Sequence, residues 1–107
     1  MKRLQIHTLD KQIQHHAHQY VRQGGKRNRR QQINRIIKFV HWIETQESIT
    51  GLEQLGKRQV VLFWKNNREL SDATLYGYWL AICLLWKWIG KPNQPPKPFT
   101  TLNKNEE

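Results

Sequence analysis

The stretch SDATLYGYWLAICLLWKWI, residues 71–89, decides the fold of this chain. Ser71 is a favourable helix N-cap, apolar residues follow at helical spacing, and Gly90-Lys91-Pro92 ends the helix. The predicted helix is apolar on two sides, one formed by Leu75, Tyr78, Trp79, Ile82, Trp86 and Ile89, the other by Gly77, Leu80, Ala81, Leu84 and Trp88. A helix that is apolar all round usually lies at the centre of a bundle. The alternative leaves the second side open for a partner protein, a second copy or a further domain.

Apolar residues at helical spacing predict three earlier helices, over residues 9–23, 28–46 and 56–66. Asn28 with Gln31 forms a capping-box pattern at the start of the second helix, and Thr50 with Glu53 forms another before a short turn. The prolines in residues 93–98 prevent a helix and predict an extended linker, followed by a polar tail. We therefore expect an all-α fold, a bundle of four helices with a Pro-rich C-terminal linker.

The positive charge of the chain is concentrated near its N-terminus. The formal net charge is +10, and residues 1–40 hold ten Lys and Arg against one acid, Asp10. Such a field attracts polyanions, with nucleic acid first and acidic membrane second. The chain has a single cysteine, Cys83, no signal-peptide pattern after Met1, and no apolar run long enough to cross a bilayer. We expect a cytoplasmic, nucleoid-associated protein that does not bind membrane.

The second predicted helix carries polar and aromatic side chains opposite its isoleucines. Gln31, Arg35, Lys38 and Trp42 share this side at helical spacing. An exposed Trp42 beside two cations indicates a nucleic-acid face with an aromatic contact. In the alternative, a loop or another helix folds over Trp42 and makes it ordinary core.

Two arginines lie where this helix is expected to begin. Arg29 and Arg30 would meet the positive end of the helix dipole, and a bound phosphate would relieve that conflict. The alternative is a solvated basic loop over residues 26–30. Lys57 and Arg58 repeat the arrangement at the start of the third helix and are secondary candidates.

The sequence contains no pattern typical of catalysis or metal binding. His15, His16 and His18 are one to three residues apart, and such a spacing does not bring three helical histidines to one ion. There is no Gly-rich phosphate loop, HExxH motif or Ser/His/Asp set. We expect neither enzyme activity nor a cofactor or metal.

The middle of the chain resembles the N-terminal core-binding domain of phage-type tyrosine recombinases. The resemblance covers roughly residues 8–98 and is carried by the segments ITGLEQL (49–55), VVLFW (60–64), LSDATL (70–75) and LLWKWI (84–89). It includes a leucine-x-x-leucine turn and an S-x-x-T cap.

The resemblance implies a SAM-like four-helix bundle that clamps one side of duplex DNA, with a proline-containing linker to a separate catalytic domain. The catalytic arginines, histidines and tyrosine of the family belong to that other domain, and this chain has no His-x-x-Arg and no tyrosine after Tyr78. The chain would be either a fragment of an integrase or a stand-alone protein that kept only the DNA clamp.

We predict an N-terminal arm (1–7), a helical DNA-binding domain (8–91) and a Pro-rich linker with a polar tail (92–107). The expected partner is double-stranded DNA, with a catalytic domain, a second copy or a partner protein at the fourth helix. Two rival hypotheses are an arginine-rich RNA-binding regulator and a protein-interaction module that uses the fourth helix. The predicted DNA-binding residues are Lys26, Arg27, Arg29, Arg30, Gln31, Asn34, Arg35, Lys38, Trp42, Lys57 and Arg58.

Overall fold

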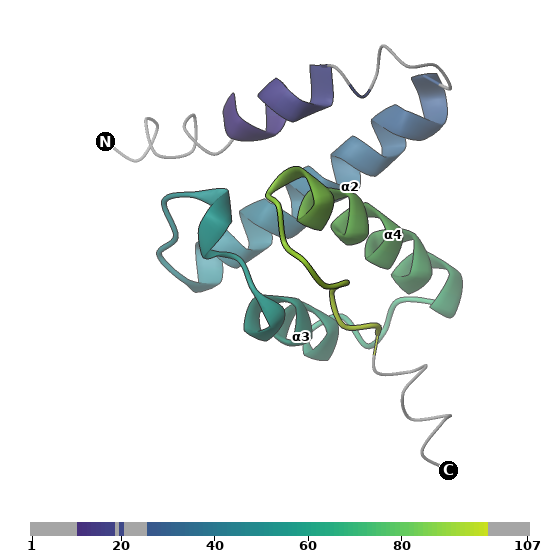
Figure 1. Ribbon diagram of the computed structural model, residues 1–107. Coiled ribbons are helices and arrows are strands. Elements are labelled where there is room, and N and C mark those ends of the chain that lie inside the picture. The colour runs from purple at the N-terminus through teal and green to yellow at the C-terminus, as the bar shows by residue number, and fades with distance from the viewer. Residues whose placement is uncertain (1–10, 19, 21–25, 99–107) are drawn as a thin grey trace.

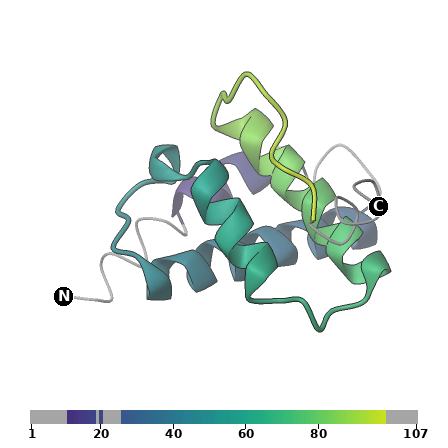
Figure 2. The same ribbon diagram turned by 90° about the horizontal axis from the view of Figure 1, so that it is seen from below.

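The computed structural model describes residues 11–18, 20 and 26–98 and shows an all-α bundle of four helices (Figure 1). Residues 11–18 and 20 are helical, and the later elements are α2 (Lys26–Gln46), the short 3-10 helix η1 (Leu52–Gln54), α3 (Lys57–Lys65) and α4 (Asp72–Trp88). None of the described residues lies in a strand. Seen from below, α2 runs along most of the length of the molecule (Figure 2). The predicted fold class is confirmed.

Both predicted ends of α4 are confirmed by their hydrogen bonds. The Ser71 side chain accepts a hydrogen bond from the backbone N–H of Thr74 at 3.2 Å. At the other end Gly90 has φ of 76°, a conformation that glycine adopts without strain. The backbone N–H of Lys91 then donates to the carbonyl of Trp86 at 3.0 Å, which closes the last turn.

α4 is packed around most of its circumference. Ala81, Ile82 and Leu85 are fully buried, and Gly77 is also buried against α2. Of the second apolar side, Leu80 keeps 37 % of its surface exposed, and the neighbouring Tyr76 keeps 56 %. α4 is therefore the central helix of the bundle, with one narrow exposed stripe.

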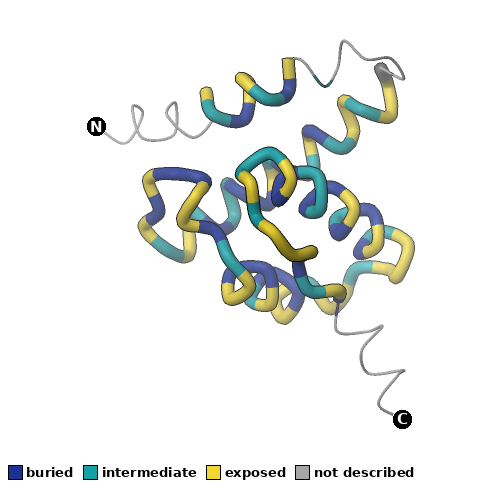
Figure 3. Tube along the Cα trace, viewed as in Figure 1, coloured by how far each residue is buried: buried dark blue, intermediate teal, exposed yellow. Residues whose placement is uncertain are grey.

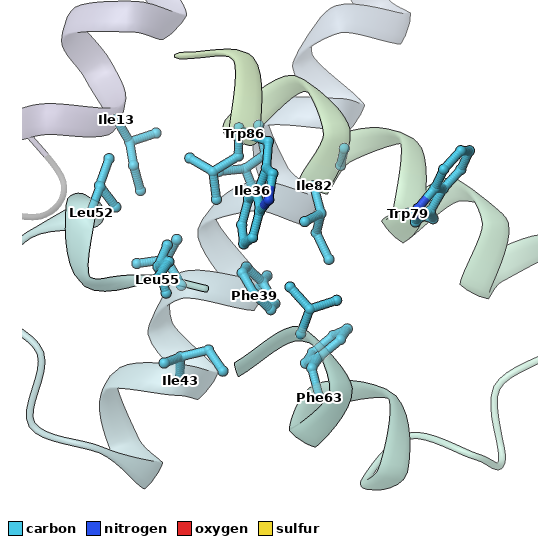
Figure 4. Packing of buried hydrophobic residues seen from close by; sticks show 14 of the residues in the cluster. Ile13, Ile36, Phe39, Ile43, Leu52, Leu55, Phe63, Trp79, Ile82 and Trp86 are labelled. Atoms are coloured by element: carbon cyan, nitrogen blue, oxygen red, sulfur yellow. The ribbon is translucent and has the colours of Figure 1, made fainter. Parts of the chain in front are cut away.

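The core is continuous across all four helices (Figures 3 and 4). Residues from the N-terminal helical segment, η1 and α2–α4 meet in one cluster that includes Ile13, Ile36, Phe39, Ile43, Leu52, Leu55, Phe63, Trp79, Ile82 and Trp86. Truncating a fully buried member such as Ile36 to alanine would cost about 2–5 kcal/mol.

The structure corrects the predicted start of the second helix. α2 begins at Lys26, so Asn28 lies inside its first turn and is not the N-cap. Lysine and arginine are good helix formers, which allows the basic segment to extend the helix. The second predicted capping box also uses a different partner. Thr50 and Gln54 exchange hydrogen bonds of 3.0 and 3.3 Å, whereas Glu53 was expected in that position.

The segment after α4 is extended, as the prolines predict, but it packs against the bundle (Figure 1). The indole N–H groups of Trp64 on α3 and Trp79 on α4 donate hydrogen bonds to the carbonyls of Pro96 and Pro95, at 3.0 and 3.1 Å. The Lys97 ammonium lies 5.4 Å from the centroid of the Trp79 ring. Residues 92–98 therefore act as a strap that ties α3 to α4, which linker composition alone does not predict.

Candidate nucleic-acid interface

Five of the predicted DNA-binding residues form one exposed stripe along α2. Because a helix turns once every 3.6 residues, the spacing of 27, 30, 31, 34 and 38 places these residues on one side. All of them are exposed, and the buried Ile33, Ile36 and Ile43 lie on the side facing the core. The stripe extends for roughly 16 Å along the helix axis. We call it the α2 stripe: Arg27, Arg30, Gln31, Asn34 and Lys38.

Arg35 lies at the border between α2 and α4 and is half-buried. A Cβ atom placed at Gly77 would be 2.9 Å from Cζ of Arg35, so the guanidinium rests on the bare backbone of α4. Sequence reasoning placed Arg35 on the polar side but missed the role of Gly77. A glycine in the middle of a strongly apolar helix was the signal, since it costs helix stability and therefore indicates that another group needs the space.

Trp42 is half-buried and contacts the core. Its ring lies 5.5 Å from that of Phe63, in an edge-to-face arrangement at 76°. Of the two interpretations of Trp42, the structure matches the one in which another helix covers it. Its position offers less ring surface to a base than a fully exposed tryptophan would.

Arg29 points to another side of α2. Its Cζ lies 4.4 Å from the centroid of the Tyr20 ring, and Tyr20 in turn contacts Trp88 edge-on. Arg29 therefore helps to hold the N-terminal helical segment, and it is separated from the α2 stripe.

Lys26 is the first residue of α2, and no acidic residue lies in the first turn of this helix. The start of α2 thus combines basic residues with the positive end of its dipole, an arrangement that favours an anion.

Lys57 and Arg58 lie at a different place, at the start of α3. Arg58 pairs with Glu47 at 2.6 Å, just beyond the C-terminal end of α2. Lys57 and Arg58 also line an open depression of about 380 Å³ together with Val61, Leu62 and Lys65. The structure therefore divides the predicted site between the α2 stripe and a separate group on α3.

The titratable groups with shifted pKa values lie away from the α2 stripe. Partial burial, and then the neighbouring His15, lower the pKa of His16 below its usual 6.5. Burial raises the pKa of the Cys83 thiol, which keeps it protonated and poorly nucleophilic near neutral pH.

Within residues 11–18, 20 and 26–98, no three His, Cys, Asp or Glu side chains are grouped so that they could hold a metal ion. The helices in the same part of the chain are too short or too polar to span a bilayer.

No family model, curated protein or solved structure matches this chain. The resemblance to recombinase core-binding domains thus rests on the sequence segments quoted above.

Proposed function

We propose that this chain is a non-catalytic domain that binds double-stranded DNA through the α2 stripe. The observation that carries the proposal is the exposure of Arg27, Arg30 and Lys38 on one side of a long helix, with Gln31 and Asn34 between them. Exposed cations on one side of a helix can contact DNA phosphates together, and phosphate contacts supply a large share of the affinity of such proteins.

The chemistry of the stripe also fits contact with base edges. The major groove admits an α-helix, and amide side chains pair there with adenine. Gln31 and Asn34 are exposed between the cations and have that chemistry. Arg35, seated on Gly77, would reach the DNA from the α4 side of the stripe. Arg29 and Trp42 mainly stabilise the fold and contribute less to binding in this proposal.

The finer proposal is a domain of the tyrosine-recombinase core-binding type, working beside a catalytic domain. The bundle of helices and the Ser71 cap are compatible with it. Its sequence support is the set of segments ITGLEQL (49–55), VVLFW (60–64), LSDATL (70–75) and LLWKWI (84–89). A protein of this type would bind duplex DNA in preference to a structured RNA hairpin.

The test is a fluorescence anisotropy titration of a short labelled duplex at several salt concentrations. If Arg27, Arg30, Arg35 and Lys38 each engage one phosphate, the affinity should fall on the order of a hundredfold between about 50 and 200 mM salt. Arg30→Gln/Lys38→Gln should reduce the slope of log K against log salt by about 2, since two phosphate contacts are lost. The matched control is Lys65→Gln/Lys87→Gln, which has the same net charge as Arg30→Gln/Lys38→Gln and replaces exposed lysines on α3 and α4.

Little salt dependence, or equal losses in the two double variants, would contradict the proposal. Tighter binding of a competing RNA hairpin at the same salt would favour the RNA-binding hypothesis instead.

A further inference from the structure

The outward face of α3 combines cations with an aliphatic surface. The open depression of about 380 Å³ is lined by Lys57, Arg58, Val61, Leu62 and Lys65, and we call it the α3 groove. Lys57, Val61 and Lys65 follow one another at four-residue intervals and therefore form one row along the helix. Val61 keeps 37 % of its surface exposed between the two lysines.

We propose that the α3 groove docks a short acidic segment of a partner protein, in which one apolar side chain is flanked by carboxylates. Charge complementarity selects the carboxylates, because Lys57, Arg58 and Lys65 line the groove. The exposed aliphatic surface of Val61 selects the apolar side chain, since covering it removes apolar area from water.

The spacing of the row defines the ligand further. Lys57 and Lys65 are roughly 12 Å apart along the helix axis, with Val61 midway between them. In an extended peptide, the residue two positions before a central residue and the residue two positions after it are roughly 13 Å apart. The sequence pattern Glu-x-Leu-x-Glu therefore matches the cation–aliphatic–cation row.

The groove differs from the α2 stripe in two ways that favour a peptide over DNA. The α2 stripe contains only charged and amide side chains, whereas the α3 groove includes the apolar side chains of Val61 and Leu62. A phosphate backbone makes no specific contact with such apolar side chains. Arg58 is already oriented by Glu47 at 2.6 Å, yet its side chain stays 76 % exposed and can donate hydrogen bonds to a second carboxylate. In Figure 1 the N-terminal half of α2 lies at the top of the view and α3 at the bottom, so one ligand need not cover both.

The experiment uses the full chain and a fluorescein-labelled peptide, GESLSEG. We expect saturable binding by anisotropy, weakened about tenfold when the peptide leucine is replaced by serine or when Lys57→Glu/Lys65→Glu is introduced. Val61→Ser should weaken binding about fivefold through lost apolar contact. Lys57, Val61 and Lys65 are all exposed, so these variants should keep the helical circular dichroism of the parent chain.

The controls separate this proposal from DNA binding. Arg30→Gln/Lys38→Gln should leave peptide affinity within about twofold. Val61→Ser should leave DNA affinity unchanged, since it alters no charge. Absence of peptide binding, or equal affinity for GESLSEG and its serine analogue, overturns the proposal. So does a loss of DNA affinity in Val61→Ser as large as the loss in Arg30→Gln/Lys38→Gln. None of these peptide results depends on whether the chain binds DNA.

Discussion

The guanidinium of Arg35 occupies the space that a side chain at Gly77 would fill, because a Cβ atom there would lie 2.9 Å from Cζ of Arg35. The contact joins α2 to α4 at the edge of the α2 stripe. It also explains why a glycine is placed inside the most apolar helix of the chain, where alanine would be the better helix former.

Gly77→Ala should therefore separate stability from function. Alanine has up to about 1 kcal/mol more helix propensity than glycine, and the group it displaces is the mobile end of the Arg35 side chain. The free energy of unfolding should therefore fall by no more than about 1 kcal/mol, and it should rise if Arg35 moves freely. The affinity for duplex DNA should decrease as Arg35 leaves its seat. Urea unfolding and anisotropy measure the two effects. In an Arg35→Ala background the effect of Gly77→Ala on DNA affinity should vanish, and an undiminished effect would contradict this account.

Trp79→Phe should remove one of the two indole hydrogen bonds that hold the strap formed by residues 92–98. The substitution removes the indole N–H that donates to Pro95 at 3.1 Å and also shortens a buried ring, so we expect a loss of about 2 kcal/mol in the free energy of unfolding. Trp42→Phe shortens a half-buried ring and should cost less than about 1 kcal/mol. Equal values for the two variants in urea unfolding would show that the strap adds nothing to stability.

Glu47 should matter more for stability than Arg58, its partner in the ion pair. Glu47 pairs with Arg58 at 2.6 Å and also accepts a hydrogen bond of 2.9 Å from the side-chain amide of Gln59. Gln59 is buried, and its side-chain oxygen accepts a hydrogen bond from the backbone N–H of Gly56 at 2.8 Å. Glu47→Ala should cost about 1–2 kcal/mol because it leaves the Gln59 amide without this acceptor. Arg58→Ala removes only an exposed ion pair and should cost less than about 1 kcal/mol. Thermal unfolding of both variants tests the order, and the reverse order would contradict it.

The stability of the protein should decrease as the pH falls through and below 6.5. The His16 ring stacks on Trp88 with centroids 5.3 Å apart, and burial followed by the neighbouring His15 lowers its pKa in the folded state. The unfolded chain then binds more protons than the folded chain below pH 6.5, so protonation favours unfolding. Urea unfolding at pH 7.5 and pH 5 should show a smaller difference in His16→Gln than in the parent chain. An NMR titration in which His16 titrates above 6.5 would contradict the prediction.

The positions of the helices were predictable because the information for them is local. Ser71 caps α4 through a hydrogen bond to a residue three positions away, and Gly90 ends the helix through its own backbone conformation. The period of the apolar residues likewise depends on neighbours within a few turns. The start of α2 was misplaced by two residues, because Asn28 has the chemistry of a cap but lies among good helix formers.

By itself, then, the sequence determined an all-α chain with a strongly apolar last helix and a basic second one. Only the tertiary structure decided what those helices present to solvent. Trp42 lies against Phe63, Arg35 rests on Gly77, and Arg29 covers Tyr20, so three predicted DNA-binding residues of the second helix each have a different set of neighbours. The strap also depends on tertiary structure, because Pro95 and Pro96 find their indole donors 16 and 32 residues away. Contacts between residues so distant in the chain are set by how the helices pack, and no local pattern specifies them.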